Sequence, residues 1–428
     1  MNRSIKILLG AAALDVGTLY FNTSGNREST AVEYAESWLR SPSRFAIDPS
    51  LPLALGRAFH GKRREGSVFH GAIADTEPDG WARRVIQRDF AKRRQDAKRR
   101  GETLDATPLT SIDYLLAVDD FSRVGALRFQ DEKGIFQRST QESHRRAPPL
   151  IELGPLMRAS HAVERNDETA KDLEYLRGRG TSVGGLRPKC TVLDDAGVLH
   201  IGKFPSVTDT RSVTKGEVLA LRIAAAAGIT AAEARLVDSD GLFVALIRRF
   251  DRTAEARRIP YMSAATMLQV EEDADEHAYT EIVDALMTFS ADFRADIEQL
   301  WRRVALAILI TNVDDHLRNI GFLHVERGKW RLAPAFDINP FPDRARELKT
   351  WISLESGPAA SIAALFGAAA EFTIDERRAR QLLAEVEHAV ASWRPIGREL
   401  GMSHTELDAF EPAFEHDERD TARRIVAG

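Results

Sequence analysis

Two stretches decide the fold of this chain: ITNVDDHLRNIGFL (310–323) and LAPAFDINPFPD (332–343). Within them Asp314 precedes Asn319 by five positions, and Asp337 follows Asn319 after eighteen. Phosphoryl transfer needs such a set, because one carboxylate orients the acceptor hydroxyl and takes its proton while an amide and a second carboxylate hold Mg²⁺. The spacing therefore predicts Asp314 as the base and the other two residues as metal ligands.

A glycine-rich loop lies upstream, GRGTSVGGLRPK (178–189), and two apolar runs follow it at 189–193 and 198–204. The residues DDAG between the runs favour a tight turn, so we expect a β-hairpin. Glycines let a backbone approach phosphate oxygens, and Lys203 on the second strand can neutralise their charge. Glycine loop, strand lysine, Asp-x4-Asn and metal aspartate follow one another in the order found in protein kinases.

An apolar helix is expected from about 215 to 227, ending at Gly228. Near its start, Glu217 is a candidate ion-pair partner for Lys203, because an ion pair fixes a long flexible side chain. A glutamate at a helix start also suits the helix dipole without any further role.

Each of these residues also has a simpler structural reading. Asp314 and Asp315 can cap a helix, and Asp337 can close a turn before Pro340. His316 can be a polar linker between helices or a metal ligand, although no second histidine or acidic residue stands at the spacing of a histidine zinc motif. The glycines alone also suit a plain flexible loop. Spacing alone leaves these alternatives open.

Composition excludes several classes of protein. The 428 residues carry 59 Lys and Arg against 64 Asp and Glu, a net charge of −5, and 43% of them are hydrophobic, as in globular proteins of two or three domains. The single cysteine, Cys190, excludes an intramolecular disulfide and a cysteine-based zinc site. No run of about 18 apolar residues predicts a membrane span, so we expect a cytoplasmic protein.

The two ends of the chain differ in pattern. Residues 1–60 favour short strands, because the apolar residues Ile5, Ile7 and Leu9 occupy alternate positions. A strand with a turn explains this opening better than an export signal. From residue 251 onward the pattern is largely helical.

A helix with an unusual charge is expected between Gly80 and Gly101. Residues 83–100 hold nine Lys and Arg against Asp89 and Asp96, a local charge of +7 in an acidic chain. Such a run is typical of a solvated helix face, and it also suits contact with nucleic acid or an acidic partner.

Motifs dispersed along most of the chain resemble, in the same order, those of the HipA family, serine/threonine kinase toxins of bacterial type II toxin–antitoxin systems. The motifs are GAIADTEPDGWARRVI (71–86), VGALRF (124–129), TSVGGLRPK (181–189), HIGKFPS (200–206), KGEVLALRIAAAAGI (215–229), RRFDR (248–252), RIPYMSAATML (258–268), NVDDHLRNIGFL (312–323) and LAPAFDINP (332–340). A set this long and ordered is far more specific than the glycine loop alone.

The resemblance implies an α+β protein with a two-lobed, protein-kinase-like fold, a β-rich N-terminal region and a mainly helical C-terminal lobe. On this basis residues 1–130 form a HipA N-terminal-like domain, residues 131–250 the kinase N-lobe with the glycine-rich loop, and residues 251–428 the helical C-lobe with the catalytic loop.

The resemblance also implies ATP and Mg²⁺ as cofactors. Asp314 corresponds to the catalytic aspartate, and Asn319 and Asp337 to the Mg²⁺ ligands. The residues implied for ATP binding are Ser182, Gly184, Gly185, Lys203, Arg248, Phe250, Asp251, His316 and Asn319.

The resemblance implies that Lys203 binds the phosphates of ATP. It also implies that the main chain of Arg248 and Phe250 faces the adenine and that Asp251 faces the ribose. Ser182 falls where the family phosphorylates its own glycine-rich loop, which ejects the loop and silences the kinase.

Two positions depart from the family pattern. Phe336 precedes the metal aspartate where tyrosine is common, and Arg248 replaces an acidic residue often seen at the hinge. The first change removes a hydroxyl, and the second changes a charge but keeps the main-chain groups.

The implied partners are a helix-turn-helix antitoxin of the HipB type, operator DNA reached mainly through that antitoxin, and a protein substrate, for which well-known members suggest an aminoacyl-tRNA synthetase. No membrane partner is implied. A small-molecule phosphotransferase and a catalytically idle corepressor module are the alternatives, and the presence of Lys203 together with Asp314, Asn319 and Asp337 argues against the idle module.

Overall fold

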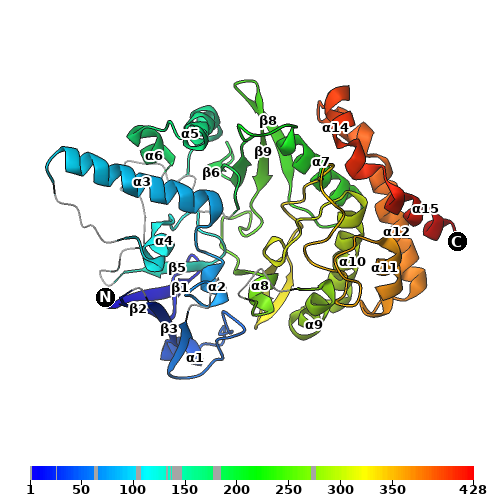
Figure 1. The fold of residues 1–428 in the computed structure, drawn as a ribbon. Helices are drawn as coiled ribbons and strands as arrows, with labels where there is room; N and C mark the ends of the chain where they lie inside the picture. The colour runs from blue at the N-terminus through cyan, green and yellow to red at the C-terminus, as the bar shows by residue number, and fades with distance from the viewer. Residues whose placement is uncertain are drawn as a thin grey trace. The chain divides into compact units, whose positions relative to one another are not determined.

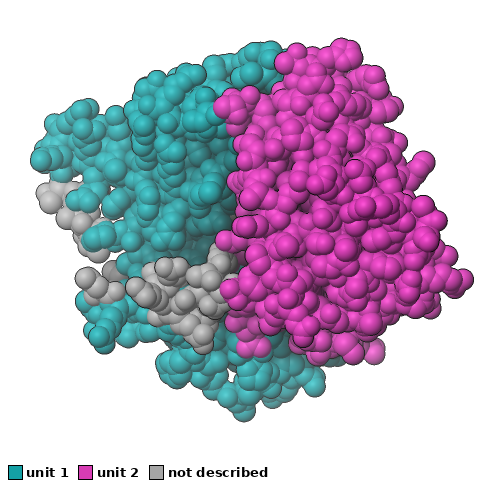
Figure 2. Space-filling view, turned by 45° about the vertical axis from the view of Figure 1, so that its right-hand side comes forward, with its two compact units in different colours: residues 1–208, 237–261 teal, residues 209–236, 262–428 magenta. Residues whose placement is uncertain are grey.

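The computed structural model describes residues 2–25, 27–61, 66–102, 108–131, 134, 136, 147–176, 185–270 and 276–428. The chain forms two compact units, which Figure 2 colours separately. Unit 1 consists of residues 1–208 and 237–261, and unit 2 of residues 209–236 and 262–428. The expected domain ranges, which follow sequence motifs rather than contacts, stay a prediction.

Unit 1 begins with a five-stranded antiparallel sheet (Figure 1), as the alternating apolar residues predict. Ile5 and Ile7 are 2% and 0% exposed, because alternate side chains of a strand face the same side. The strands, in the order β4-β3-β2-β1-β5, are β1 (Asn2–Leu9), β2 (Leu14–Ser24), β3 (Arg27–Tyr34), β4 (Arg57–Gly61) and β5 (Leu127–Gln130). The helices of this region are α1 (Glu36–Arg40), α2 (Gly71–Ala74), α3 (Gly80–Arg99) and α4 (Ser111–Ala117).

A four-stranded sheet with the order β6-β7-β9-β8 carries the predicted hairpin. β6 and β7 pair antiparallel, and Asp194 Oδ1 closes the turn between them by accepting hydrogen bonds from the main-chain nitrogens of Ala196 and Val198 at 3.0 and 2.8 Å. The hairpin prediction is confirmed. The elements are η1 (Leu150–Glu152), α5 (Leu153–Arg165), α6 (Ala170–Leu176), β6 (Lys189–Leu193), β7 (Leu199–Lys203), β8 (Ala234–Ser239), which crosses the division between the units, and β9 (Leu242–Arg248).

The core of unit 1 joins α3 and α5 to this sheet. Trp81 and Val85 of α3 pack with Leu156 of α5 and with Val192 and Phe204 beside the hairpin. Burying large apolar side chains stabilises a fold by about 1.5–3 kcal/mol each. The hairpin that ends in Lys203 is therefore fixed by packing on its back.

Unit 2 is mainly helical, as predicted, and is built around α10 (Phe293–Leu309). Asp292 caps this helix by accepting a hydrogen bond from Ala295 N, and Leu300, Trp301 and Val304 are fully buried. The other helices are α7 (Val213–Ala226), α8 (Ala264–Met267), α9 (Tyr279–Phe289), η2 (Leu317–Asn319), α11 (Ile362–Gly367), η3 (Ala368–Ala370), α12 (Glu376–Ala391), α13 (Trp393–Glu399), α14 (His404–Phe414) and α15 (Asp417–Ala427).

Helix α7 confirms the expected helix that ends at Gly228, whose φ of +73° suits a helix C-terminus. It packs against α14 at very short range, because a Cβ on Gly216 would lie 2.6 Å from Cζ of Phe410. Lys215 Nζ donates to Glu406 Oε1 at 2.8 Å, and the lysine side chain is only 7% exposed. The first turn of α7 is thus tied to the C-terminal helices.

A second hairpin interrupts the helices of unit 2, where sequence patterning predicted none. β11 (Gly321–Glu326) pairs antiparallel with β12 (Lys329–Leu332) and, on its other side, lies next to β10 (Tyr261–Ser263). Strands of four to six residues give too few alternations to stand out from the helical background. Among the residues that the structure describes, no helix combines the length and the apolar character needed to span a membrane.

Candidate functional site

The loop that carries Asp314 starts where α10 ends, and buried polar contacts on both sides of Asp314 fix it in place. Thr311, with a positive φ of 53°, donates its hydroxyl to Ala413 O at 3.0 Å. Tyr279 Oη donates to Asp315 Oδ2 at 2.5 Å, and Thr350 Oγ1 donates to Asp315 O at 2.7 Å. These bonds leave the loop little freedom in the main chain.

The segment that carries Asp337 is hydrogen-bonded to this loop. Asn339 N donates to Asn312 Oδ1 at 3.1 Å, and Phe341 N donates to Thr311 O at 3.2 Å. Asp337 has a φ of +54°, a conformation that a residue with a side chain adopts only where the surrounding structure holds it. The structure therefore brings the two predicted stretches side by side.

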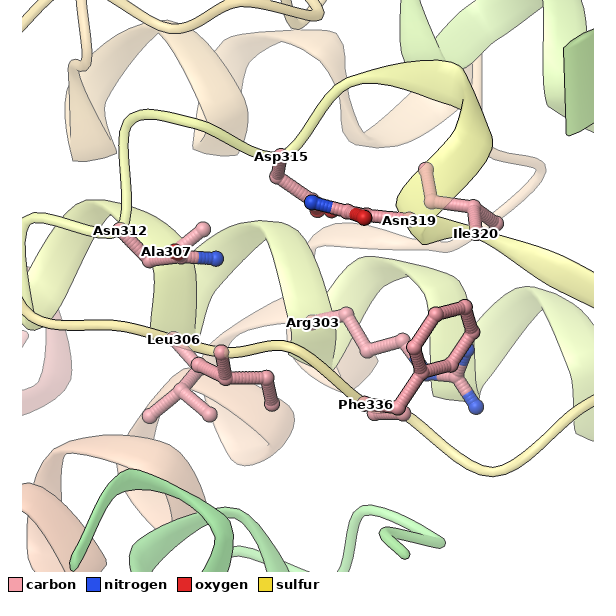
Figure 3. A pocket seen from close by; sticks show the side chains of 10 residues that line it. Arg303, Leu306, Ala307, Asn312, Asp315, Asn319, Ile320 and Phe336 are labelled. Atoms are coloured by element: carbon pink, nitrogen blue, oxygen red, sulfur yellow. The ribbon is translucent and has the colours of Figure 1, made fainter. Parts of the chain in front are cut away.

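A small pocket lies between the loop and this segment (Figure 3). Asp315 and Asn319 point toward one another in it. Its volume of about 20 Å³ is room for one water rather than for a nucleotide. The lining residues are Arg303, Leu306, Ala307, Asn312, Asp315, Asn319, Ile320, Ala335, Phe336 and Ile338. Phe336 and Ile338 flank Asp337, so this residue and Asn319 belong to one neighbourhood.

Asn319 and Asp337 offer the hard oxygens that Mg²⁺ prefers. Asn319 Nδ2 donates to Asp314 O at 3.1 Å, which turns the amide oxygen away from the loop main chain. Asp337 Oδ1 accepts a hydrogen bond from Asn339 Nδ2 at 3.0 Å, and a carboxylate is a donor type that binds Mg²⁺. The chemistry of these donors fits a magnesium ion.

The side chain of Asp314 lies at the surface of unit 2 and is 49% exposed. Its Oδ2 is 3.4 Å from Nη1 of Arg344. An exposed carboxylate next to the proposed metal ligands is accessible to an acceptor hydroxyl, as a general base must be.

His316 caps the short helix η2, and its main-chain oxygen accepts a hydrogen bond from Asn319 N at 2.8 Å. Its Nδ1 is buried, and no described residue gives it a hydrogen-bond partner. His316 therefore keeps a polar atom for a ligand.

Sequence reasoning missed the buried polar groups behind this loop. Burial raises the pKa of Asp315, and burial lowers the pKa of Arg303 to about 10. Arg303 Nη2 donates to Ala333 O at 2.6 Å, next to the segment of Asp337. Asp315 follows Asp314 in the sequence, but only the fold shows that the two carboxylates face different surroundings.

Unit 1 carries most of the residues predicted to bind the nucleotide, whereas His316 and Asn319 belong to unit 2. Lys203, at the end of β7, is 8% exposed and pairs in register with Lys189 on β6 and Ala245 on β9. The next residue, Phe204, is fully buried and donates its main-chain N–H to Pro188 O at 3.0 Å. The lysine is thus held by strand pairing on both sides.

The end of the glycine-rich loop rests on the start of helix α3. Gly185 N donates to Asp79 Oδ1 at 2.5 Å, and Gly185 O accepts from Trp81 N at 2.9 Å. Gly185 has a φ of +98°, which requires a glycine. Ser182 and Gly184 lie outside the described residues. Asp79 was not predicted as a site residue, although its motif was part of the family resemblance.

Strand β9 ends at the predicted hinge. Arg248 pairs in register with His200 on β7, and the ring centroid of Phe250 lies 6.3 Å from that of Tyr261. Both residues are partly buried. Their main-chain role toward adenine stays a prediction.

Asp251 sits in a buried cluster of charges in unit 1 and is 4% exposed. Its Oδ2 accepts hydrogen bonds from Gly125 N and from Arg252 Nη1, each at 2.7 Å, and Arg249 binds both carboxylate oxygens. Burial opposes ionisation, but Arg249 and Arg252 bring the pKa of Asp251 well below its ordinary value. Oδ1 accepts one hydrogen bond, from Arg249 Nε, and the contact of Asp251 with a ribose stays a prediction.

The basic helix α3 is anchored at one end and exposed at the other. Arg88 Nη1 lies 2.6 Å from Glu168 Oε1, within unit 1. Arg99 and Arg100 are 66% and 61% exposed in their side chains. At this end Arg99 pairs with Asp96 and Arg100 pairs with Glu102, and contact with an anionic partner stays a prediction.

Two family models match the chain: the HipA-like C-terminal domain over residues 181–393 and the HipA N-terminal domain over residues 10–102. The chain belongs to the HipA family. The two HipA matches cover most of the motifs that carried the resemblance, including the glycine-rich loop, the hairpin with Lys203 and the catalytic loop.

Two known proteins are similar to this chain, one in structure and one in sequence. A chain of the solved complex of HipA, HipB and operator DNA, from the toxin–antitoxin system of Shewanella oneidensis MR-1, is similar with a TM-score of 0.66 and 15% identity, covering 99% of this chain and 96% of that chain. This likeness confirms the predicted α+β, kinase-like HipA fold.

A Haemophilus influenzae protein named "Putative kinase" is 24% identical over 188 residues, which make up 39% of this chain and 55% of that protein. The match thus spans about half the length of this curated relative.

Proposed function

We propose that this HipA-family chain is an ATP- and Mg²⁺-dependent protein kinase that transfers the γ-phosphoryl group to a serine or threonine of a protein. One observation carries the proposal: hydrogen bonds within unit 2 join the segment of Asp337 to the loop of Asp314 and Asn319. These are the three residues whose spacing predicts phosphoryl transfer.

Each residue has a defined role in this reaction. Asp314 accepts the proton of the acceptor hydroxyl, and the oxygens of Asn319 and Asp337 hold Mg²⁺. When bound, the metal ion neutralises charge on the phosphate oxygens. Lys203 binds the phosphates of ATP, with the glycine-rich loop over them, and the hinge main chain at Arg248 and Phe250 binds the adenine.

The partners follow from the family. We propose a helix-turn-helix antitoxin of the HipB type, because the similar HipA chain was solved with HipB and operator DNA. The antitoxin supplies most of the DNA contact. The protein substrate is a cytoplasmic protein, with an aminoacyl-tRNA synthetase as the candidate class, and Ser182 is the site of self-phosphorylation.

Brief expression of the wild type and of Asp314→Asn, followed by phosphoproteomics, tests the proposal. Loss of a general base lowers a rate by about 10² to 10⁴, so the new phosphosites should vanish with Asp314→Asn. Asp408→Asn, an exposed carboxylate paired with Arg394 in the same unit, is the matched control and should retain them. Equal phosphorylation by folded Asp314→Asn would refute the proposal, and transfer to metabolites but not to proteins would favour the small-molecule phosphotransferase.

A further inference from the structure

The segment that follows the predicted metal ligand runs along the loop of Asp314 and is fixed to it at two points. Phe341 N donates to Thr311 O, and Lys349 N donates to Val313 O, each at 3.2 Å. These two bonds fall on either side of Arg344. These hydrogen bonds place the segment 341–349 beside the loop of Asp314 within unit 2.

Arg344 projects from this segment to Asp314. Its Nη1 lies 3.4 Å from Oδ2 of the carboxylate, and its guanidinium carbon lies 3.9 Å from the ring centroid of Phe341. The stacking on an aromatic face restricts the guanidinium plane. Oδ1 of the neighbouring Asp343 lies 3.1 Å from Nη1 of Arg211, and this ion pair is a further attachment of the segment to unit 2.

Asp314 needs such a partner. Its side chain is half exposed, and among the described residues Arg344 is the one side chain that binds its carboxylate. A half-exposed aspartate without a partner rotates about its Cα–Cβ and Cβ–Cγ bonds, whereas proton transfer requires an oxygen held within hydrogen-bond reach of the hydroxyl.

We infer that Arg344 is a positioning residue for Asp314, which rests on the proposed function. The guanidinium holds Oδ2 and directs Oδ1 to the acceptor. In the transfer step the acceptor oxygen forms a bond to the γ-phosphorus, the bond from that phosphorus to ADP breaks, and the hydroxyl proton passes to Oδ1. Arg344 itself exchanges no proton and touches no reacting atom.

Arg344→Gln and Arg344→Lys test this role, with Arg346→Gln as the matched control. Arg346 lies in the same exposed segment but donates to Pro412 O at 3.2 Å instead. The assay measures phosphate transfer from ATP with Mg²⁺ to myelin basic protein, a general acceptor, together with the affinity for ATP.

An ion pair that is half exposed contributes little, so Arg344→Gln should lower kcat about two- to fivefold without a change in the KM for ATP. Arg344→Lys should recover part of the rate, because it restores the charge without the planar fork. Arg346→Gln should match the wild type. In the Asp314→Asn background, Arg344→Gln should have no further effect, because it acts through the carboxylate.

The outcomes separate the inference from the function beneath it. A wild type that transfers phosphate while Arg344→Gln equals it refutes the positioning role alone. A faster Arg344→Gln would show that the ion pair blocks the acceptor, which also overturns it. A wild type that phosphorylates neither this acceptor nor any cellular protein refutes the proposed function and the inference with it.

Discussion

Replacing Asp251 with asparagine should destabilise unit 1 rather than weaken ATP binding directly. The carboxylate is 4% exposed and lies between Arg249 and Arg252, whose side chains are 2% and 6% exposed. Burial lowers the pKa of Arg252 to about 9 although Asp251 lies beside it and opposes this shift, so the charge of Arg252 is costly to bury. Asparagine keeps the shape but leaves both guanidiniums uncompensated.

Breaking a buried ion pair from one side costs about 3 to 5 kcal/mol. At 3 kcal/mol, and with about 2 to 4 °C per kcal/mol for a unit of this size, the Tm should fall by about 6 to 12 °C. The matched control is Asp240→Asn, whose carboxylate is 58% exposed and pairs with Arg158. That change should cost less than about 1 kcal/mol.

Thermal unfolding of the full chain and calorimetric titration with ATP measure both effects. The pKa of Asp251 is lower in the fold than in the unfolded chain, so its stabilisation is complete above the ordinary carboxyl pKa of about 4 and is lost as the pH falls through the folded value. The gap between wild type and Asp251→Asn should therefore stay constant from pH 5 to pH 8. An unchanged Tm together with a clear loss of ATP affinity would contradict the stabilising role of Asp251 and would support its contact with the ribose.

Four further outcomes are expected. Asp337→Ala should weaken ATP binding in Mg²⁺ but not in EDTA, as measured by titration, because it removes a proposed metal ligand. Ser182→Ala should keep ATP binding and gain no phosphate by intact mass, whereas Ser182→Asp should lose ATP affinity through repulsion between anions. Gly216→Ala should lower the Tm, because its methyl group would meet the buried ring of Phe410 at 2.6 Å. Exposed Lys and Arg of α3 can be replaced with Gln and the operator affinity of the complex with the antitoxin measured against salt. The slope of log K against log salt concentration should become shallower by about 0.9 for each lost phosphate contact, and an identical slope would show that α3 is only a solvated helix.

Sequence patterns predicted local structure around the candidate site, whereas the roles of its residues stay predictions. The hairpin that ends at Lys203 and the stretch from Asp314 to Asn319 each depend on residues close together in the chain. Turn propensity and residue type therefore suffice to predict them. The burial of Asp251 could not be predicted in this way, because Gly125, its main-chain partner, lies 126 positions away. The contact between Asp79 and Gly185 spans 106 positions and was missed for the same reason.

The periodicity of apolar residues did not predict the short strands of unit 2. β11 and β12 have six and four residues, so the helical period around them dominates any window of usual length. The ion pair between Arg344 and Asp314 could not be predicted either, because nothing in the spacing of thirty residues says that the segment turns back onto the loop.

The way α7 is held by unit 2 has a consequence for synthesis on the ribosome. Ten of its fourteen residues are buried. Glu406 and Phe410 contact its first turn, yet they are synthesised about 180 residues after the helix itself. At a translation rate of about 5 to 20 residues per second, the helix waits about 10 to 40 s for these partners. During that interval a nascent chain exposes an apolar helix, and it is the stage at which chaperone capture is most favourable.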